Sequence, residues 1–144
     1  MKERAPLPDR ARTGFSALLD AKILEATARR VKVSMEVTDR VRQSLGVVHG
    51  GALVTLADIA ATYGAYVAGR EGFDQVTTGM TVHFLRGVRE GTLVAVARPL
   101  RVGKRTSVWE VRIDEEKAGE GEEPVCFVTA NFAARERSVR DSEC

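Results

Sequence analysis

The most constraining feature of the sequence is an apolar, alanine-rich stretch at residues 52–68 that carries one formal charge, Asp58. Its length and alanine content favour an α-helix over a β-strand. Because the stretch is apolar on nearly every face, we expect a helix buried in a folded domain. A membrane-spanning helix of about 20 residues would have a similar composition. Asp58 near the middle, Gly64 and two tyrosines argue against that alternative and favour a core helix wrapped by a sheet.

A single carboxylate on a buried helix has a high free-energy cost unless it has a partner. Asp58 could pair with a lysine or arginine, or face a boundary between subunits. Alternatively, it could act as a nucleophile or general base in a shielded cleft. The sequence leaves these readings open, but the residues that precede the helix favour the functional one.

Two glycines, Gly50 and Gly51, stand at the expected N-terminus of this helix. They leave backbone N–H groups uncovered, and the helix dipole there favours an oxygen that gains negative charge. Gly51 and Asp58 are two turns apart on one helix face, roughly 10 Å along the axis. One carbonyl group cannot reach both within one chain. Two helices packed antiparallel about a two-fold axis would bring Asp58 of one chain near the glycines of the other, which predicts an active site shared between subunits.

Alternating and continuous apolar patterns predict six strands around this helix. They are expected at residues 22–28, 31–38, 76–85, 92–100, 105–114 and 125–134, after a short helix at 14–19. On the 76–85 strand, alternation places Met80 and Val82 on one face and Thr77 and His83 on the other. Trp109 should point inward. The short connections predict an antiparallel sheet that curls around one helix, an α+β domain with apolar area left for dimerisation.

The length of 144 residues predicts one domain, at residues 13–135, between a loose basic arm at 1–12 and a polar tail at 136–144. The net charge of +2 is too small to indicate nucleic acid or a membrane as a partner. Two cysteines, Cys126 and Cys144, do not form a disulfide framework, and the N-terminal residues do not read as a signal segment. We therefore expect a cytoplasmic protein. Histidine and cysteine do not cluster at metal-ligand spacing, so we expect no metal.

The motif His49-Gly50-Gly51, the Asp58 that follows and the run Val82-His83-Phe84-Leu85-Arg86 resemble the hotdog-fold acyl-CoA thioesterases. The resemblance covers roughly residues 15–135. It is strongest to the phenylacetate-pathway-like branch of the 4-hydroxybenzoyl-CoA thioesterase superfamily, and the hairpin Gly103-Lys104-Arg105 gives it weaker support. It implies a hotdog fold and thioester hydrolysis. It also implies that Asp58 serves as nucleophile or base and that the Gly50 N–H, or that of Gly51, binds the carbonyl oxygen.

The resemblance implies further roles, each with a plainer alternative. His49 would lie beside the thioester, or would only fix the turn. Gln43 stands where many relatives carry an asparagine that orients the site or the water, but it could be a surface residue. Thr77, which fits the alternation better than Thr78, would hold water beside the acid or be an ordinary strand residue. Three basic residues would contact the CoA phosphates unless they are only solvated surface charges: Arg86, Lys104 and Arg105.

Thioester hydrolysis with no cofactor is the leading hypothesis, because CoA is part of the substrate. The expected assembly is a homodimer or a dimer of dimers, and the acyl group could be aryl or medium-chain aliphatic. A hotdog dehydratase would need a histidine base with an acid on the helix, and the spacing of His49 and Asp58 fits a hydrolase better. A non-catalytic acyl-CoA-binding protein and a purely structural dimer module are further alternatives.

Overall fold

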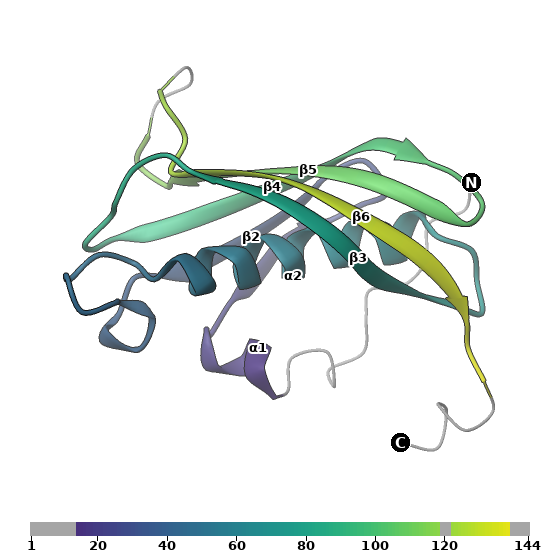
Figure 1. Cartoon of the computed structure of the whole chain (residues 1–144), viewed down its shortest axis with the longest axis horizontal. Coiled ribbons are helices and arrows are strands. Elements are labelled where there is room, and N and C mark those ends of the chain that lie inside the picture. Colours follow the sequence, from purple (N-terminus) through teal and green to yellow (C-terminus); the bar gives the residue numbers. More distant parts are fainter. Residues whose placement is uncertain (1–13, 119–121, 139–144) are drawn as a thin grey trace.

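The computed structural model describes residues 14–118 and 122–138. The expected arm at 1–12 and Cys144 lie outside these residues. The helices and strands follow in the order α1 (Phe15–Leu18), β1 (Lys22–Ala26), β2 (Val31–Glu36), the 3-10 turn η2 (Asp39–Val41), α2 (Gly50–Ala68), β3 (Phe73–Phe84), β4 (Thr92–Val102), β5 (Thr106–Glu115) and β6 (Cys126–Glu136). All neighbouring strands are antiparallel in one six-stranded sheet of order β1-β2-β4-β5-β6-β3 (Figure 1).

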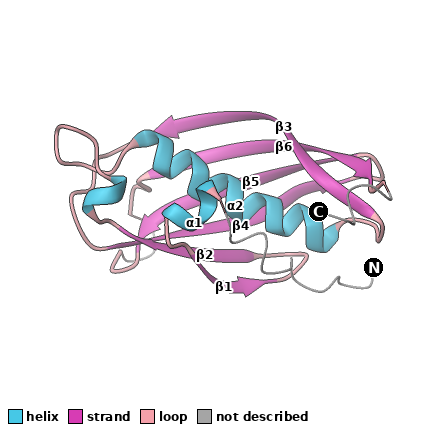
Figure 2. Ribbon diagram, turned by 90° about the horizontal axis from the view of Figure 1, so that it is seen from below, coloured by secondary structure: helices cyan, strands magenta, loops and turns pink. Residues whose placement is uncertain are grey.

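The sheet curves along one side of α2, and the core lies between them (Figure 2). Inward side chains alternate along the central strands, and Trp109, Val111 and Ile113 of β5 are fully buried. This arrangement confirms the α+β prediction of six antiparallel strands around one long helix. By length and composition α2 could also cross a membrane, but here its buried face packs on the sheet.

One narrow face of α2 is partly exposed, although most of the helix surface is buried. The sheet-facing side includes Leu56 and Ala60, both fully covered. The opposite side carries Thr55, Asp58 and Thr62, which are partly exposed in the single chain. The isolated charge of α2 therefore lies on its open face, where water or a second protein chain can reach it.

Helix and sheet approach each other closely at Gly64. A Cβ atom added there would lie 2.4 Å from the nearest ring atom of Trp109, well inside ordinary contact distance. Trp109 is fully buried, and its indole N–H donates to Ser107 Oγ at 3.3 Å. The glycine thus leaves room for the indole between α2 and β5.

Strand β3 contains a bulge that reverses the alternation expected from the sequence. Its pairing with β6 shifts between Thr77 and Gly79. Met80 and Val82 pack against the core, and Thr77, predicted to lie on the opposite face, contacts α2 on this same side. The assignment of Thr77 and Met80 to opposite faces was therefore wrong, because one extra residue in a strand changes which face the preceding residues occupy.

Several element ends also differ from the prediction. Strand β4 continues through Pro99, beyond the last residue that pairs with β2, Ala97. Proline is tolerated there because no neighbouring strand needs its missing N–H on that side. Strand β6 runs to Glu136, and Arg137 forms an ion pair with Asp74. Strand β6 therefore ends two residues beyond Ala134, the end predicted for the last strand.

Candidate active site

The turn that enters α2 is fixed by His49. This residue is the N-cap of the helix, and its Nδ1 accepts the Gly51 N–H at 2.8 Å. Its own N–H donates to the Val41 carbonyl at 2.6 Å, and the Val48 N–H donates to the Val88 carbonyl at 2.7 Å. Because Nδ1 accepts a hydrogen bond, a neutral His49 carries its proton on Nε2. His49 therefore positions the turn and leaves one N–H donor on its ring.

The backbone N–H groups of the two glycines in the turn differ in whether they already donate a hydrogen bond. The Gly51 N–H is taken by His49. For the Gly50 N–H, no acceptor occurs within residues 14–118 and 122–138. Gly50 also lies against the Phe84 ring, since a Cβ there would be 3.2 Å from it. Of the two N–H groups, the one at Gly50 is thus available to an incoming carbonyl oxygen.

Among the described residues, Asp58 is held by hydroxyl groups and not by a cation. Thr77 Oγ1 donates to Asp58 Oδ1 at 2.7 Å, and Thr62 Oγ1 approaches the same oxygen at 3.5 Å. In the described part of the chain, no lysine or arginine forms an ion pair with Asp58. The reading of Asp58 as half of an ion pair therefore has no support among these residues. None of them donates a hydrogen bond to the second carboxylate oxygen, which is left for another partner.

Gly50 and Asp58 cannot act on one carbonyl group within a single chain. Eight residues of α-helix separate them, about 12 Å along the axis. Strand β3, which carries Thr77 and Phe84, forms one edge of the sheet. The exposed apolar residues at this edge include Val76, Phe84 and Leu85. The structure thus places both parts of the candidate site on or beside an open edge that a second copy could cover.

Three further side chains make other contacts in the single chain: Gln43, which was predicted for the site, Thr78, the less favoured alternative to Thr77, and His83, which was not assigned a role. The Gln43 side chain accepts the Leu45 N–H and so closes its own loop. Thr78 Oγ1 donates to the Asn131 carbonyl of the neighbouring strand at 3.2 Å. His83 is exposed on β3. None of these three side chains contacts Asp58 or the His49 turn through a hydrogen bond among the described residues.

The three basic residues expected to contact CoA phosphates do not lie together. Arg86 forms an ion pair with Glu115 at 2.8 Å and donates to the Glu123 carbonyl at 3.3 Å. Lys104 and Arg105 are exposed in the hairpin before β5, whereas Glu115 ends that strand. Arg86 is therefore a whole strand away from the other two, and one chain cannot place all three on the same phosphates.

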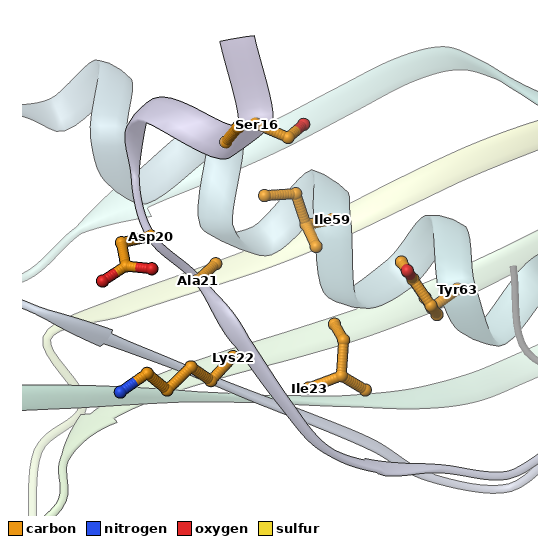
Figure 3. Close-up of a pocket in the computed structure, with 8 residues that line it drawn as sticks. Ser16, Asp20, Ala21, Lys22, Ile23, Ile59 and Tyr63 are labelled. Carbon is orange, nitrogen blue, oxygen red and sulfur yellow. The ribbon is translucent and has the colours of Figure 1, made fainter. Parts of the chain in front are cut away.

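Two cavities flank α1, the short helix beside α2. One, of about 600 Å³, adjoins the His49 turn and is lined by Phe15, Leu18, Leu19, Arg40, Val41, Arg42, His49, Gly51, Ala52 and Thr55. The other, of about 350 Å³, lies between α1, β1 and α2, and Figure 3 shows Ile23, Ile59 and Tyr63 among its lining residues. Within residues 14–118 and 122–138, the buried Tyr63 hydroxyl has no hydrogen-bond partner. Sequence reasoning did not find the first cavity, because Phe15 and Leu18 resemble ordinary packing residues of a short helix.

The described residues contain no group of three or more histidine, cysteine, aspartate or glutamate side chains placed to hold a metal. Cys126 is fully buried, and burial raises the pKa of its thiol to about 11. A thiol with so high a pKa is protonated near neutral pH and is a poor nucleophile. The candidate chemistry therefore rests on Asp58 and the turn at Gly50.

Comparison with known proteins decides the family. The family model described as "Thioesterase superfamily" matches residues 45–122, which include the His49 turn, all of α2 and the strands β3 to β5. The chain belongs to the thioesterase superfamily. The expected class of enzyme, a thioester hydrolase, is confirmed at this level.

Individual members of the thioesterase superfamily align over most of the chain. It is 29% identical to the 1,4-dihydroxy-2-naphthoyl-CoA hydrolase of Listeria monocytogenes over 126 residues, which cover 86% of this chain and 98% of that protein. It is 35% identical to the Escherichia coli hydrolase of the same name over 89 residues, 60% of this chain and 64% of that protein. The solved structure of a thioesterase from Haemophilus influenzae superposes with a TM-score of 0.83 at 23% identity, covering 94% and 96% of the two chains. That structure supports the fold.

Proposed function

We propose that this thioesterase-superfamily protein hydrolyses acyl-CoA thioesters to the free acid and CoA, with an active site shared between two subunits. The observation that carries the proposal is the Asp58 carboxylate, which lies on the open face of α2 and is oriented by the Thr77 hydroxyl at 2.7 Å, with no cationic partner in the described part of the chain. The phenylacetate-pathway-like branch is part of this proposal. Two relatives named for a naphthoyl-CoA substrate favour an aromatic acyl group.

In the proposed reaction, the thioester carbonyl oxygen accepts the free Gly50 N–H, at the positive end of the α2 dipole. Asp58 of the other subunit either takes a proton from the attacking water or attacks the carbonyl carbon itself. Oxygen adds to that carbon, the C–S bond breaks, and CoA leaves as a thiolate that takes up a proton. If Asp58 attacks directly, a second step with water releases the acid from the mixed anhydride. His49 holds the turn and offers its Nε2–H to the substrate.

A two-fold axis beside β3 would complete this site. Pairing of β3 with β3 of a second copy would continue the sheet, because β3 is an edge strand. The two α2 helices would then run antiparallel beside each other. Each Asp58 would approach the Gly50 turn of the other subunit, which closes the gap of about 12 Å that separates them within one chain. The exposed Val76, Phe84 and Leu85 would be covered in such a dimer.

The direct test is a thiol-release assay over a panel of acyl-CoAs, from acetyl-CoA to aromatic thioesters. We expect the wild-type protein to hydrolyse aromatic acyl-CoAs, and Asp58→Asn to reduce kcat by about 100-fold or more while the protein stays folded and assembled. Asp114→Asn serves as the matched control, because that carboxylate is paired with Arg112 on β5 and is not part of the proposed site. Full activity of Asp58→Asn would rule out the mechanism, whereas binding of acyl-CoA without turnover in the wild-type protein would indicate an acyl-CoA-binding protein.

Subunit mixing tests whether the site is shared. Chains with Asp58→Ala and chains with Gly50→Pro each lack one part of every site as homodimers and should be inactive. In a mixed dimer, one of the two sites regains both parts, so random 1:1 mixing should restore about a quarter of the wild-type activity. A mixture that exchanges subunits, as shown by mass spectrometry of the intact dimer, but stays inactive would refute the shared site.

A further inference from the structure

The cavity of about 600 Å³ beside the His49 turn has an unusual wall on its α1 side. Helix α1 has four residues, none of which is buried. Its two large apolar side chains line the cavity, yet Phe15 is 66% exposed and Leu18 is 60% exposed. Large apolar side chains that border a cavity and remain open to water are typical of a surface that binds an apolar group.

This cavity adjoins the candidate active site. Its lining includes His49, Gly51 and Thr55, which belong to the turn and the open face of α2. A thioester carbonyl bound at Gly50 therefore has the cavity directly beside it. Of the two groups attached to that carbonyl, the acyl group and the pantetheine arm of CoA, one would extend into the cavity.

The hydrogen bonds already made by residues that line the cavity indicate whether the acyl group or the pantetheine arm would enter it. His49 Nδ1 is occupied by the Gly51 N–H, and Thr55 Oγ1 donates to the Gly51 carbonyl at 2.8 Å. The Arg42 guanidinium is engaged with Asp39 and with the carbonyls of Val37 and Arg89. Pantetheine carries two amides that need hydrogen-bond partners. Among the described side chains that line the cavity, these contacts leave the His49 Nε2–H and the exposed Arg40 as donors. An apolar acyl group has no such requirement.

We propose that this cavity is the acyl-binding pocket and that Phe15 and Leu18 select for large apolar, above all aromatic, acyl groups. The inference rests on the proposed function, because it needs a thioester at Gly50. An aromatic ring would lie between the Phe15 ring and α2, in a volume within the range of small-molecule pockets. Exposed Arg40 lies at the rim of the cavity, where a polar substituent on the ring could reach it.

Because Phe15 and Leu18 are exposed, replacing them should affect ligand binding without affecting folding. Phe15→Ala and Leu18→Ala remove little buried area, so both variants should fold like the wild type. Leu100→Ala is the matched control, since Leu100 is 57% exposed on β4 and does not line this cavity. With benzoyl-CoA, kcat/KM should fall about tenfold or more in Phe15→Ala and Leu18→Ala, and with acetyl-CoA it should change less than about twofold. Leu18→Trp, which narrows the cavity, should reject benzoyl-CoA and still hydrolyse acetyl-CoA.

Two kinetic outcomes would overturn the inference. An equal loss of kcat/KM with acetyl-CoA and benzoyl-CoA would place the pantetheine arm in the cavity, and an unchanged kcat/KM for both substrates in all three variants would place the acyl group elsewhere. Calorimetric binding of benzoyl-CoA to Asp58→Asn separates this inference from the proposed function. Weaker binding when Phe15→Ala is added supports the pocket even if the wild-type protein hydrolyses no thioester, and unchanged binding refutes it.

Discussion

Replacing Gly50 with proline would remove one backbone N–H and leave the helix start intact. Proline is favoured at the first position of a helix, because the N–H there has no partner within the helix. The residue before proline must be extended, and His49 already is, with φ −69° and ψ 135°. No described residue accepts the Gly50 N–H, so the substitution breaks no hydrogen bond of the described chain. Its effect on stability should be small.

The effect on catalysis should be large if this N–H binds the carbonyl oxygen. Loss of one such donor reduces kcat by about 10² to 10³, equivalent to about 3–4 kcal/mol of transition-state stabilisation. Gly50→Ala is the matched control, because it adds the same Cβ contact with Phe84 but keeps the N–H. We therefore expect Gly50→Ala to stay within a few-fold of the wild type.

The assay compares kcat of the three proteins on one aromatic acyl-CoA, with thermal melting and oligomeric state measured in parallel. Equal activity of Gly50→Pro and Gly50→Ala, at equal melting temperature, would show that the N–H is not the carbonyl donor. Equal loss in both variants would trace the effect to the crowding of Phe84. Only a loss confined to the proline variant supports the proposed role.

Three further predictions concern the core. Gly64→Ala should lower the free energy of unfolding, because overpacking against Trp109 costs typically about 1–3 kcal/mol, whereas the higher helix propensity of alanine contributes only about 1 kcal/mol. In urea titrations, the loss should be smaller when Trp109 is replaced by phenylalanine. Tyr63→Phe should leave stability unchanged or raise it by up to about 1 kcal/mol, since no described residue bonds to the hydroxyl, and a clear loss in the same titration would reveal a partner. The Cys126 thiol, with its pKa raised to about 11, should resist iodoacetamide at pH 8 until the protein unfolds, and labelling of the native protein at Cys126, detected by mass spectrometry, would contradict this. The free energy of unfolding should fall as pH rises from 9 towards 11, because the thiol ionises at a lower pH in the unfolded chain.

Local patterns in the sequence were sufficient to locate the main elements. The alanine-rich run predicted α2, and period-two alternation predicted the inward side chains of β5, including Trp109. Alternation failed at Thr77 because it assumes an unbroken strand, and the bulge in β3 reverses it there. A bulge depends on the pairing of β3 with β6, which no local pattern records.

The isolated charge of Asp58 on an apolar helix, and the glycine pair at the start of that helix, are visible in the order of the residues. Which groups around them are hydrogen-bonded and which are free depends on how the chain folds. Thr77 of β3 donates a hydrogen bond to Asp58 of α2, and His49 accepts the Gly51 N–H but not that of Gly50. Arg86 forms an ion pair with Glu115. Hydrogen bonds and ion pairs depend on distance in space, and residues far apart in the chain reach that distance only when the sheet closes on the helix.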